Sequence, residues 1–198
     1  LSSKSFLQIQ DNEEPHCKIE DIEKKSKGII LFSGSIDGLI GKLFFKNLTD
    51  EIFDIFKRFK SVFEDNFYIE VQRHDDHGEK LFEKFLINTA EKLELPLIAT
   101  HEVFYLNKDM HEAHDAFLCI GQKTYVNAKD RKKYTDAHYL KTSQEMCKIF
   151  NDLPDALANN SNFPLRISYR PKNSSPVLPD IKTSQNENID DLLISDSR

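Results

Sequence analysis

The sequence predicts an α/β fold in which parallel strands form part of a (β/α) barrel, followed by an irregular tail. Three segments support this prediction. Residues 67–72 alternate apolar and polar side chains, as strands do. Residues 78–95 place leucines and phenylalanines at helical spacing, and residues 96–100 are a short apolar run that begins with a proline. Strand, helix and strand in this order make a βαβ unit, whose two strands are parallel.

The segments before this unit follow the same alternation. Residues 1–27 are polar, with Ile19 and Ile22 as the expected buried contacts. Residues 28–34 (GIILFSG) form a buried strand that ends in small turn residues. Residues 35–47 connect this strand to the next helix and include a short helix with one apolar face. Strand and helix therefore alternate from the first apolar run onward.

A longer helix is predicted from Thr49 to about Asp65. Thr49 or Asp50 is expected to cap it, since their side-chain oxygens accept free amide protons. Its apolar stripe consists of Ile52, Phe53, Phe56, Phe59 and Phe63.

Two further helices are predicted after residue 105. Asp109 is expected to cap a helix that ends near Ile120 and turns Ala113, Phe117 and Ile120 inward. Thr142 or Ser143 caps the other, and Glu145 follows Thr142 at the spacing of a capping box. Pro154–Asn160 adds a helical turn.

The chain is predicted to divide near residue 160. Residues 1–160 form a partial domain of β/α units. Residues 161–198 are rich in Asn, Ser and Pro and are expected to be a linker with little core, apart from a helix at Ile189–Ile194.

Composition restricts the class of protein. Hydrophobic residues make up 39% of the chain, which allows a core, and the net charge of −6 argues against an independent grip on nucleic acid. Cys17, Cys119 and Cys147 are odd in number and far apart, which indicates reduced thiols and a cytoplasmic protein. No apolar run reaches the length of a membrane span, so no membrane partner is expected.

Carboxylate and imidazole side chains follow both strands of the βαβ unit. In parallel α/β folds, ligands bind at the carboxyl ends of the strands. Carboxylate and imidazole groups at this position can bind a divalent metal ion or transfer a proton. Arg73 is expected to form an ion pair beside Glu70 rather than bind phosphate. No Gly-rich phosphate loop, GxSxG or HExxH motif occurs. The candidate site residues are Glu70, His74, His77, His101, Glu102, His111, Glu112 and His114.

Each candidate has a structural alternative. Glu70, His74 and Glu102 are suited to metal binding, but hydrogen bonds that hold the fold are the favoured role for them. His111, Glu112 and His114 belong to a predicted helix, where ordinary polar surface residues are expected.

Five phrases in order resemble the alpha subunit of bacterial DNA polymerase III: GIILFSG, FYIEVQRH, LPLIATHEVFYL, EAHDAFLCIGQ and HYLKTSQEMCKIFNDLPDALANN. They are similar to the second half of its polymerase-and-histidinol-phosphatase (PHP) domain, over about residues 28–160 and more loosely over 174–193. The resemblance implies a fragment of a distorted (β/α) barrel. It also implies a role in DNA replication, in a subunit that extends DNA with Mg²⁺ held on a palm domain outside this chain.

The resemblance also implies partners and a degenerate metal site. The partners are the remainder of the alpha subunit and a proofreading exonuclease subunit, with DNA contacted only through the parent enzyme. In metal-binding relatives a histidine stands where this chain has Phe104, and an aspartate where it has Glu102. Glu70 and His74 remain suitable ligands, so the implied site is Glu70, His74 and Glu102, with weak Zn²⁺ or Mn²⁺ binding and no catalytic residue.

Three hypotheses follow. The first is a structural and docking module of a replicative polymerase. The second is a free-standing metal-dependent phosphoesterase of the PHP type, which Phe104 and the lack of a His-x-His pair disfavour. The third is a non-catalytic interaction protein that shares half of the barrel.

Overall fold

A three-stranded parallel sheet organises the first of the two units of the chain. The computed structural model describes residues 1–7, 15–173, 175–176 and 189–197, which divide into the units 1–166 and 167–198. The strands β1 (Leu31–Phe32), β2 (Phe67–Val71) and β3 (Leu97–Ala99) lie in the order β1-β2-β3. Leu31 pairs with Phe67, and Ile69 pairs with Leu97, both in parallel register. The predicted parallel βαβ unit is therefore confirmed.

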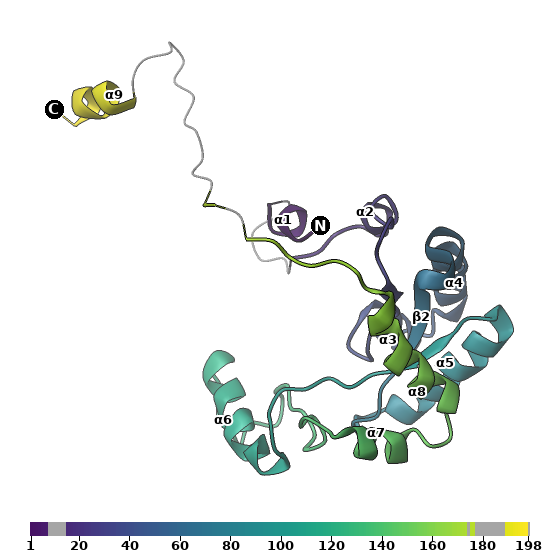
Figure 1. The fold of residues 1–198 in the computed structure, drawn as a ribbon. Helices are drawn as coiled ribbons and strands as arrows, with labels where there is room; N and C mark the ends of the chain where they lie inside the picture. The colour runs from purple at the N-terminus through teal and green to yellow at the C-terminus, as the bar shows by residue number, and fades with distance from the viewer. Residues whose placement is uncertain (8–14, 174, 177–188, 198) are drawn as a thin grey trace. The chain divides into compact units, whose positions relative to one another are not determined.

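Helices make up most of the first unit (Figure 1). The longest, α4 and α5, confirm the two predicted helices on either side of β2 in the sequence, whereas α1 and α2 were not predicted. The helices are α1 (Ser2–Leu7), α2 (Ile19–Glu23), α3 (Leu39–Phe45), α4 (Thr49–Phe63), α5 (Glu79–Leu93), α6 (His111–Gly121), α7 (Ser143–Ile149) and α8 (Pro154–Asn162), with 3₁₀ turns η1 (Glu64–Asn66), η2 (Lys108–Met110) and η3 (Phe163–Arg166).

The core is built where the phenylalanine stripe of α4 meets β2. The ring of Phe67 lies 5.6 Å from that of Phe56 and 5.4 Å from that of Phe59, between ring centroids, and all three are buried. Phe82 and Leu86 of α5 are buried in the same cluster. Aromatic rings bury large apolar areas, so this stripe holds β2 in place. The predicted core face of α4 is thereby confirmed for Ile52, Phe56, Phe59 and Phe63, whereas Phe53 is only half-buried.

The outer edge of β3 is covered by side-chain donors from α8. The carboxamides of Asn159 and Asn160 donate hydrogen bonds of 2.7 Å to the carbonyls of Leu97 and Ala99. Carbonyls alternate along a strand, and that of Pro96 accepts from β2. The two capped carbonyls therefore point away from the sheet.

The predicted inward face of α6 is wrong. Phe117 and Ile120 are 71% and 75% exposed, and only Cys119 on this helix is buried. The helix is held instead by its polar side, where Asp115 forms a bidentate ion pair with Arg131. An apolar stripe predicts burial, but no described residue covers this one.

Two predicted helix caps are also wrong. The helix α4 begins at Thr49, with Leu48 at the N-cap and no side-chain capping bond. Asp109 lies inside η2, so Met110 takes the N-cap of α6. In contrast, Thr142 caps α7 as predicted, and its hydroxyl accepts from the amide of Glu145 at 3.3 Å.

The capping box of α7 provides a pH-dependent contribution to stability. The amide of Thr142, the hydroxyl of Tyr139 and the hydroxyl of Thr142 donate to the Glu145 carboxylate, which lowers its pKa from 4.5 to about 2. Because the folded pKa is lower than the unfolded one, this contribution is present above pH 4.5 and is lost as the pH falls toward 2.

We expect stability to change less with pH in Glu145→Gln than in the wild type over this range. The amide of glutamine can keep the capping box with Thr142, but it cannot ionise. Thermal melts between about pH 6 and pH 2.5 should show the wild type falling toward the variant as carboxyl groups protonate. If the melting temperatures of wild type and variant differed by the same amount at every pH, the assigned hydrogen bonds to Glu145 would be contradicted.

The first unit continues a few residues past the predicted boundary at 160. The ring of Phe163 lies 5.3 Å from that of Phe32, and Arg166 donates to Asn66 at 2.7 Å. In the second unit, residues 167–173 and 175–176 have no regular structure, and α9 (Ile189–Asp196) confirms the predicted helix. The remainder of the predicted tail, 174, 177–188 and 198, lies outside the described residues.

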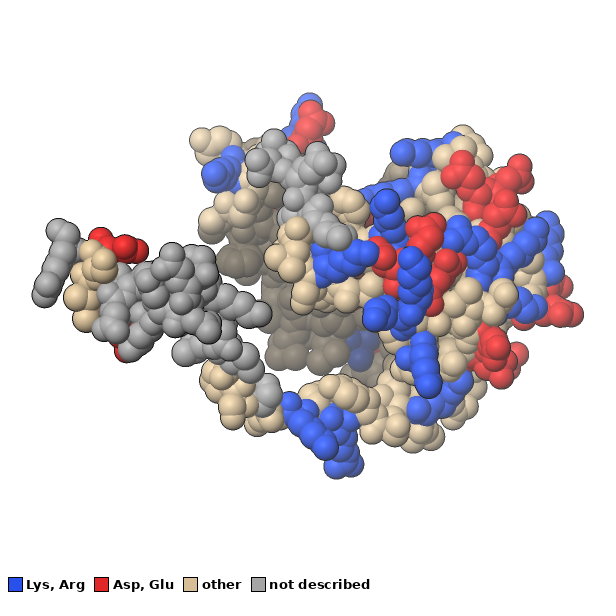
Figure 2. All heavy atoms as spheres, turned by 90° about the horizontal axis from the view of Figure 1, so that it is seen from above, with Lys and Arg blue, Asp and Glu red and all other residues tan. Residues whose placement is uncertain are grey.

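Among the described residues, no helix is both long enough and apolar enough to cross a membrane. The three cysteines are unbridged, as the sequence predicts. On the face shown in Figure 2, basic and acidic side chains are interspersed rather than segregated. Such a mixed face lacks the continuous positive field that holds a nucleic-acid backbone.

Candidate metal centre

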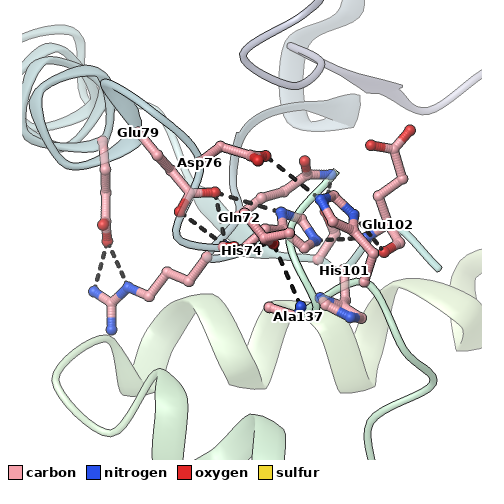
Figure 3. Close-up of polar contacts among 12 residues, drawn as sticks. Gln72, His74, Asp76, Glu79, His101, Glu102 and Ala137 are labelled. Atoms are coloured by element: carbon pink, nitrogen blue, oxygen red, sulfur yellow. Dashed lines mark hydrogen bonds and ion pairs between the residues drawn. The ribbon is translucent and has the colours of Figure 1, made fainter. Parts of the chain in front are cut away.

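The carboxyl ends of β2 and β3 meet beside a third segment, residues 135–139. His74 follows β2, and Glu102 follows β3 (Figure 3). The third segment is held in place by the hydroxyl of Thr135, which donates to the carbonyl of His74, and by an isolated parallel bridge between Tyr105 and Tyr139. Residues distant in the sequence therefore meet where the sequence analysis expected a site.

The carboxylate of Glu70 is occupied by protein donors. The amide of Gly34 and the side chain of Gln72 each donate to it at 3.1 Å, and the hydroxyl of Thr100 donates a third bond. The amide of Glu70 itself donates to the Ser33 hydroxyl at 2.9 Å. Glu70 thus connects the ends of all three strands, which matches the structural alternative given for this residue.

His74 is buried, and both of its ring nitrogens face protein groups. Its Nδ1 lies 3.4 Å from a carboxylate oxygen of Glu79, which also accepts the backbone amide of His74 at 2.8 Å. Its Nε2 accepts the backbone amide proton of Glu102 at 3.1 Å. The ring is therefore held in the tautomer that carries its proton on Nδ1.

Glu102 contributes its backbone to this region rather than its carboxylate. The side chain is exposed and points away from the His74 ring (Figure 3). The neighbouring His101 stacks on His74 at 4.5 Å between ring centroids, and its Nε2 lies 2.9 Å from the carbonyl of Tyr139. Burial, together with the nearby Lys141 ammonium, lowers the pKa of His101 to about 4, so this ring is neutral near pH 7.

His74 forms a possible His/Asp metal site with two residues that the sequence analysis did not single out. One potential ligand atom from each of His74, Asp76 and His138 lies within 4.8 Å of the other two. The rings of His74 and His138 are stacked at 4.1 Å with an interplanar angle of 1°. Asp76 follows His74 by two residues, and His138 opens the phrase HYLKTSQEM. The sequence indicates Asp76 only by its closeness to His74, and His138 only by its place in that phrase.

The remaining candidates lie apart from this cluster or make structural contacts. His111 places its Nε2 2.9 Å from the carbonyl of Tyr134, and the ring of His114 stacks on Phe104 at 5.4 Å. His77 and Glu112 are exposed.

The expected pair of Arg73 with Glu70 is not formed. Arg73 instead binds Glu83 of α5 at 2.5 Å and Asp152 at 2.7 Å, and its guanidinium lies over the ring of Phe150. Hydrogen bonding to Asp152, followed by that to Glu83, raises the pKa of Arg73 above its ordinary value. The guanidinium is thus engaged by α5 and by residues 149 and 152, rather than by Glu70.

Comparison with known proteins shows which proteins the chain resembles. The family profile described as "PHP domain" matches residues 1–74. DNA polymerase III subunit alpha of Caulobacter vibrioides is 34% identical over 188 residues, which are 95% of this chain and 16% of that protein. The chain is similar to one segment of DNA polymerase III alpha subunits. The subunit of Rickettsia bellii is also 34% identical, over 92% of this chain, and that of Vibrio cholerae is 28% identical over all of it.

The chain spans about one sixth of the length of the relatives it matches. The match also begins earlier than the resemblance in the sequence suggested, since the family profile starts at residue 1 rather than near residue 28. The polar N-terminal residues, with the helices α1 and α2, thus lie within the match to the PHP profile.

The ligand set that the PHP resemblance implies does not fit a shared ion in this segment. The Glu70 carboxylate is occupied by three donors, and that of Glu102 is exposed. Phe104, in the place of a histidine ligand, packs 5.1 Å from the ring of His138 and 4.2 Å from that of Tyr134, between ring centroids. A phenyl ring has no lone pair to give a metal, so it contributes packing alone.

Proposed function

We propose that this chain is a PHP module of a replicative DNA polymerase alpha subunit and supplies structure and docking rather than chemistry. The observation that supports the proposal most directly is 34% identity over 95% of the chain to a protein named DNA polymerase III subunit alpha. DNA synthesis and its Mg²⁺ belong, in this proposal, to the rest of such a subunit. A cytoplasmic location is part of the same proposal.

The polar groups at the strand ends support a structural role. Glu70 uses its carboxylate to join three strand ends, and Phe104 replaces a ligand with an apolar ring. Hydrolysis of a phosphoester by a metal cluster needs several converging lone pairs that activate a water molecule. The free-standing phosphoesterase is therefore the less favoured function.

The uncovered apolar face of α6 supports docking. Phe117 and Ile120 are largely exposed, and Tyr125 just beyond the helix is 84% exposed. Clustered exposed apolar residues mark interaction surfaces. We assign this surface to the remainder of the alpha subunit, because the chain spans only about one sixth of its relatives. Contact with a proofreading exonuclease subunit remains an implication of the family resemblance.

We expect the isolated chain to show no turnover of a chromogenic phosphomonoester or of single-stranded DNA with Mn²⁺ or Zn²⁺, because Glu70 is unavailable as a ligand. The matched control is the double variant Glu70→Ala, His74→Ala, which should give the same background rate. Metal-dependent hydrolysis that this variant abolishes would contradict the structural role and favour the phosphoesterase.

A further inference from the structure

We propose that His74, Asp76 and His138 bind a single Zn²⁺ ion, at a position different from the ligand set that the PHP resemblance implies. This site shares only His74 with the set Glu70, His74 and Glu102. It rests on the contacts of the three side chains and is independent of the proposed polymerase role.

His138 supplies the decisive observation. Its side chain is 1% exposed, and its Nε2 is a buried nitrogen without a hydrogen-bond partner among the described residues. Its Nδ1 lies 3.3 Å from the carbonyl oxygen of Glu102, which can only accept, so Nδ1 carries a proton. The lone pair of the neutral ring is then on Nε2, and a buried nitrogen left in this way is costly unless something binds it.

Asp76 stands opposite that nitrogen. Its Oδ2 lies 3.5 Å from Nε2 of His138, which is longer than a good hydrogen bond. Two electron-rich atoms at this separation repel each other unless a cation lies between them. In a tetrahedral zinc site with ligand bonds of about 2.1 Å, neighbouring ligands are roughly 3.4 Å apart. The observed separation therefore suits two ligands of one ion.

His74 is the third ligand and already has an outer partner. Glu79 faces its Nδ1 at 3.4 Å, the carboxylate–histidine arrangement that orients metal-binding imidazoles. The ion would replace the Glu102 amide proton at Nε2, a contact of 3.1 Å. It would also tilt the parallel rings of His74 and His138 so that both nitrogens face it. Loss of that hydrogen bond and of the stacking limits the affinity.

An ion can reach this place from solvent. A pocket of about 610 Å³ is lined by Asp76, His77 and Tyr134 and by the basic side chains of Lys42, Lys46, Arg131, Lys132 and Lys133. The side chain of Asp76 keeps 24% of its surface exposed, so it stands between the pocket and the buried His138. Solvent would provide the fourth ligand from the same side.

The donor set selects the metal. Two imidazole nitrogens and one carboxylate oxygen suit Zn²⁺ and its tetrahedral substitute Co²⁺, whereas Mg²⁺ prefers six oxygen ligands. Zn²⁺ should therefore bind and Mg²⁺ at equal concentration should not.

The test is a Co²⁺ titration of the complete chain, followed by visible absorption, with Zn²⁺ added to displace the cobalt. We expect the intense visible bands of four-coordinate Co²⁺ and their loss with Zn²⁺. His138→Phe keeps an aromatic ring against His74 and should weaken binding at least about 10–100-fold, the range seen even for outer-sphere partners. Circular dichroism should show that the variant remains folded.

His77→Gln is the matched control, since His77 is exposed and adjacent to Asp76. It should bind Co²⁺ as the wild type does. Equal binding by His138→Phe, or loss of binding in His77→Gln alone, would overturn the proposal. So would nitrogen NMR that finds Nε2 of His138 protonated at saturating Zn²⁺, since the site would then be an imidazolium–carboxylate pair. Zinc binding without turnover would leave the structural role of the chain intact.

Discussion

Gly41→Ala is expected to destabilise the first unit by more than about 3 kcal/mol, beyond the usual range for overpacked cores. A methyl group at this position in α3 would lie 1.8 Å from the carbonyl oxygen of Ile36 and 2.5 Å from its carbonyl carbon. These are backbone atoms, so no change of side-chain rotamer relieves the clash. The neighbouring Ile40 is 1% exposed, and displacement of α3 would open the core around it.

The measurement is urea denaturation followed by circular dichroism, with Gly121→Ala as the matched control. Gly121 ends α6, and a methyl group there would meet nothing within 4 Å. Alanine favours helices over glycine by up to about 1 kcal/mol, so this variant should be neutral or slightly stabilised. Similar midpoints for the two variants would contradict the close packing of α3 against Ile36.

Arg73→Ala is expected to lower the free energy of unfolding by about 2–3 kcal/mol, less than the 3–5 kcal/mol for a fully buried broken pair because Asp152 is half exposed. Arg73 and Glu83 keep only 24% and 14% of their side-chain surface exposed. The variant removes two ion pairs, a bond to the Ile149 carbonyl and the contact over Phe150. It leaves the carboxylate of Glu83 largely buried and unpaired.

Arg58→Ala provides the comparison for Arg73. Arg58 pairs with Glu20 and Glu23 but is 46% exposed, so its loss should destabilise the fold much less than the loss of Arg73. Arg73→Lys should recover part of the stability, since an ammonium keeps the charge but cannot bind two carboxylates with a planar fork. Thermal melts at low and high salt distinguish the pairs of Arg58 from those of Arg73. Salt screens exposed pairs more strongly, so the effect of Arg58→Ala should shrink more at high salt than that of Arg73→Ala. Equal losses for both alanine variants would show that Arg73 is not a buried anchor.

The parallel sheet could be predicted from the sequence because its signals are local. Residues 67–72 alternate, the next helix repeats its apolar side chains, and the chain returns in a short apolar run, so one connection determines the pairing. The capping box of Thr142 and Glu145 is likewise contained in four residues. Such features require no knowledge of distant contacts.

The candidate site depends on contacts that no local pattern specifies. His138 meets His74 across 64 positions of sequence only because residues 135–139 run alongside the strand ends. The pairing of Arg73 with Asp152 could not be predicted for the same reason, since the two residues lie 79 positions apart. The face of α6 was predicted inward from its apolar stripe, but a stripe indicates that a surface will be covered without saying by which chain.

The carboxamides of Asn159 and Asn160 determine at which edge the sheet can accept a further strand. A bare strand edge recruits any extended peptide, and proteins block such edges to prevent uncontrolled polymerisation. Here the carbonyls that an incoming strand would need on the β3 side are already bonded to Asn159 and Asn160. Within the described part of the chain, β1 has a neighbour on one side only. Any strand that this sheet recruits, from the same polypeptide or another, should therefore add beside β1 and not beside β3.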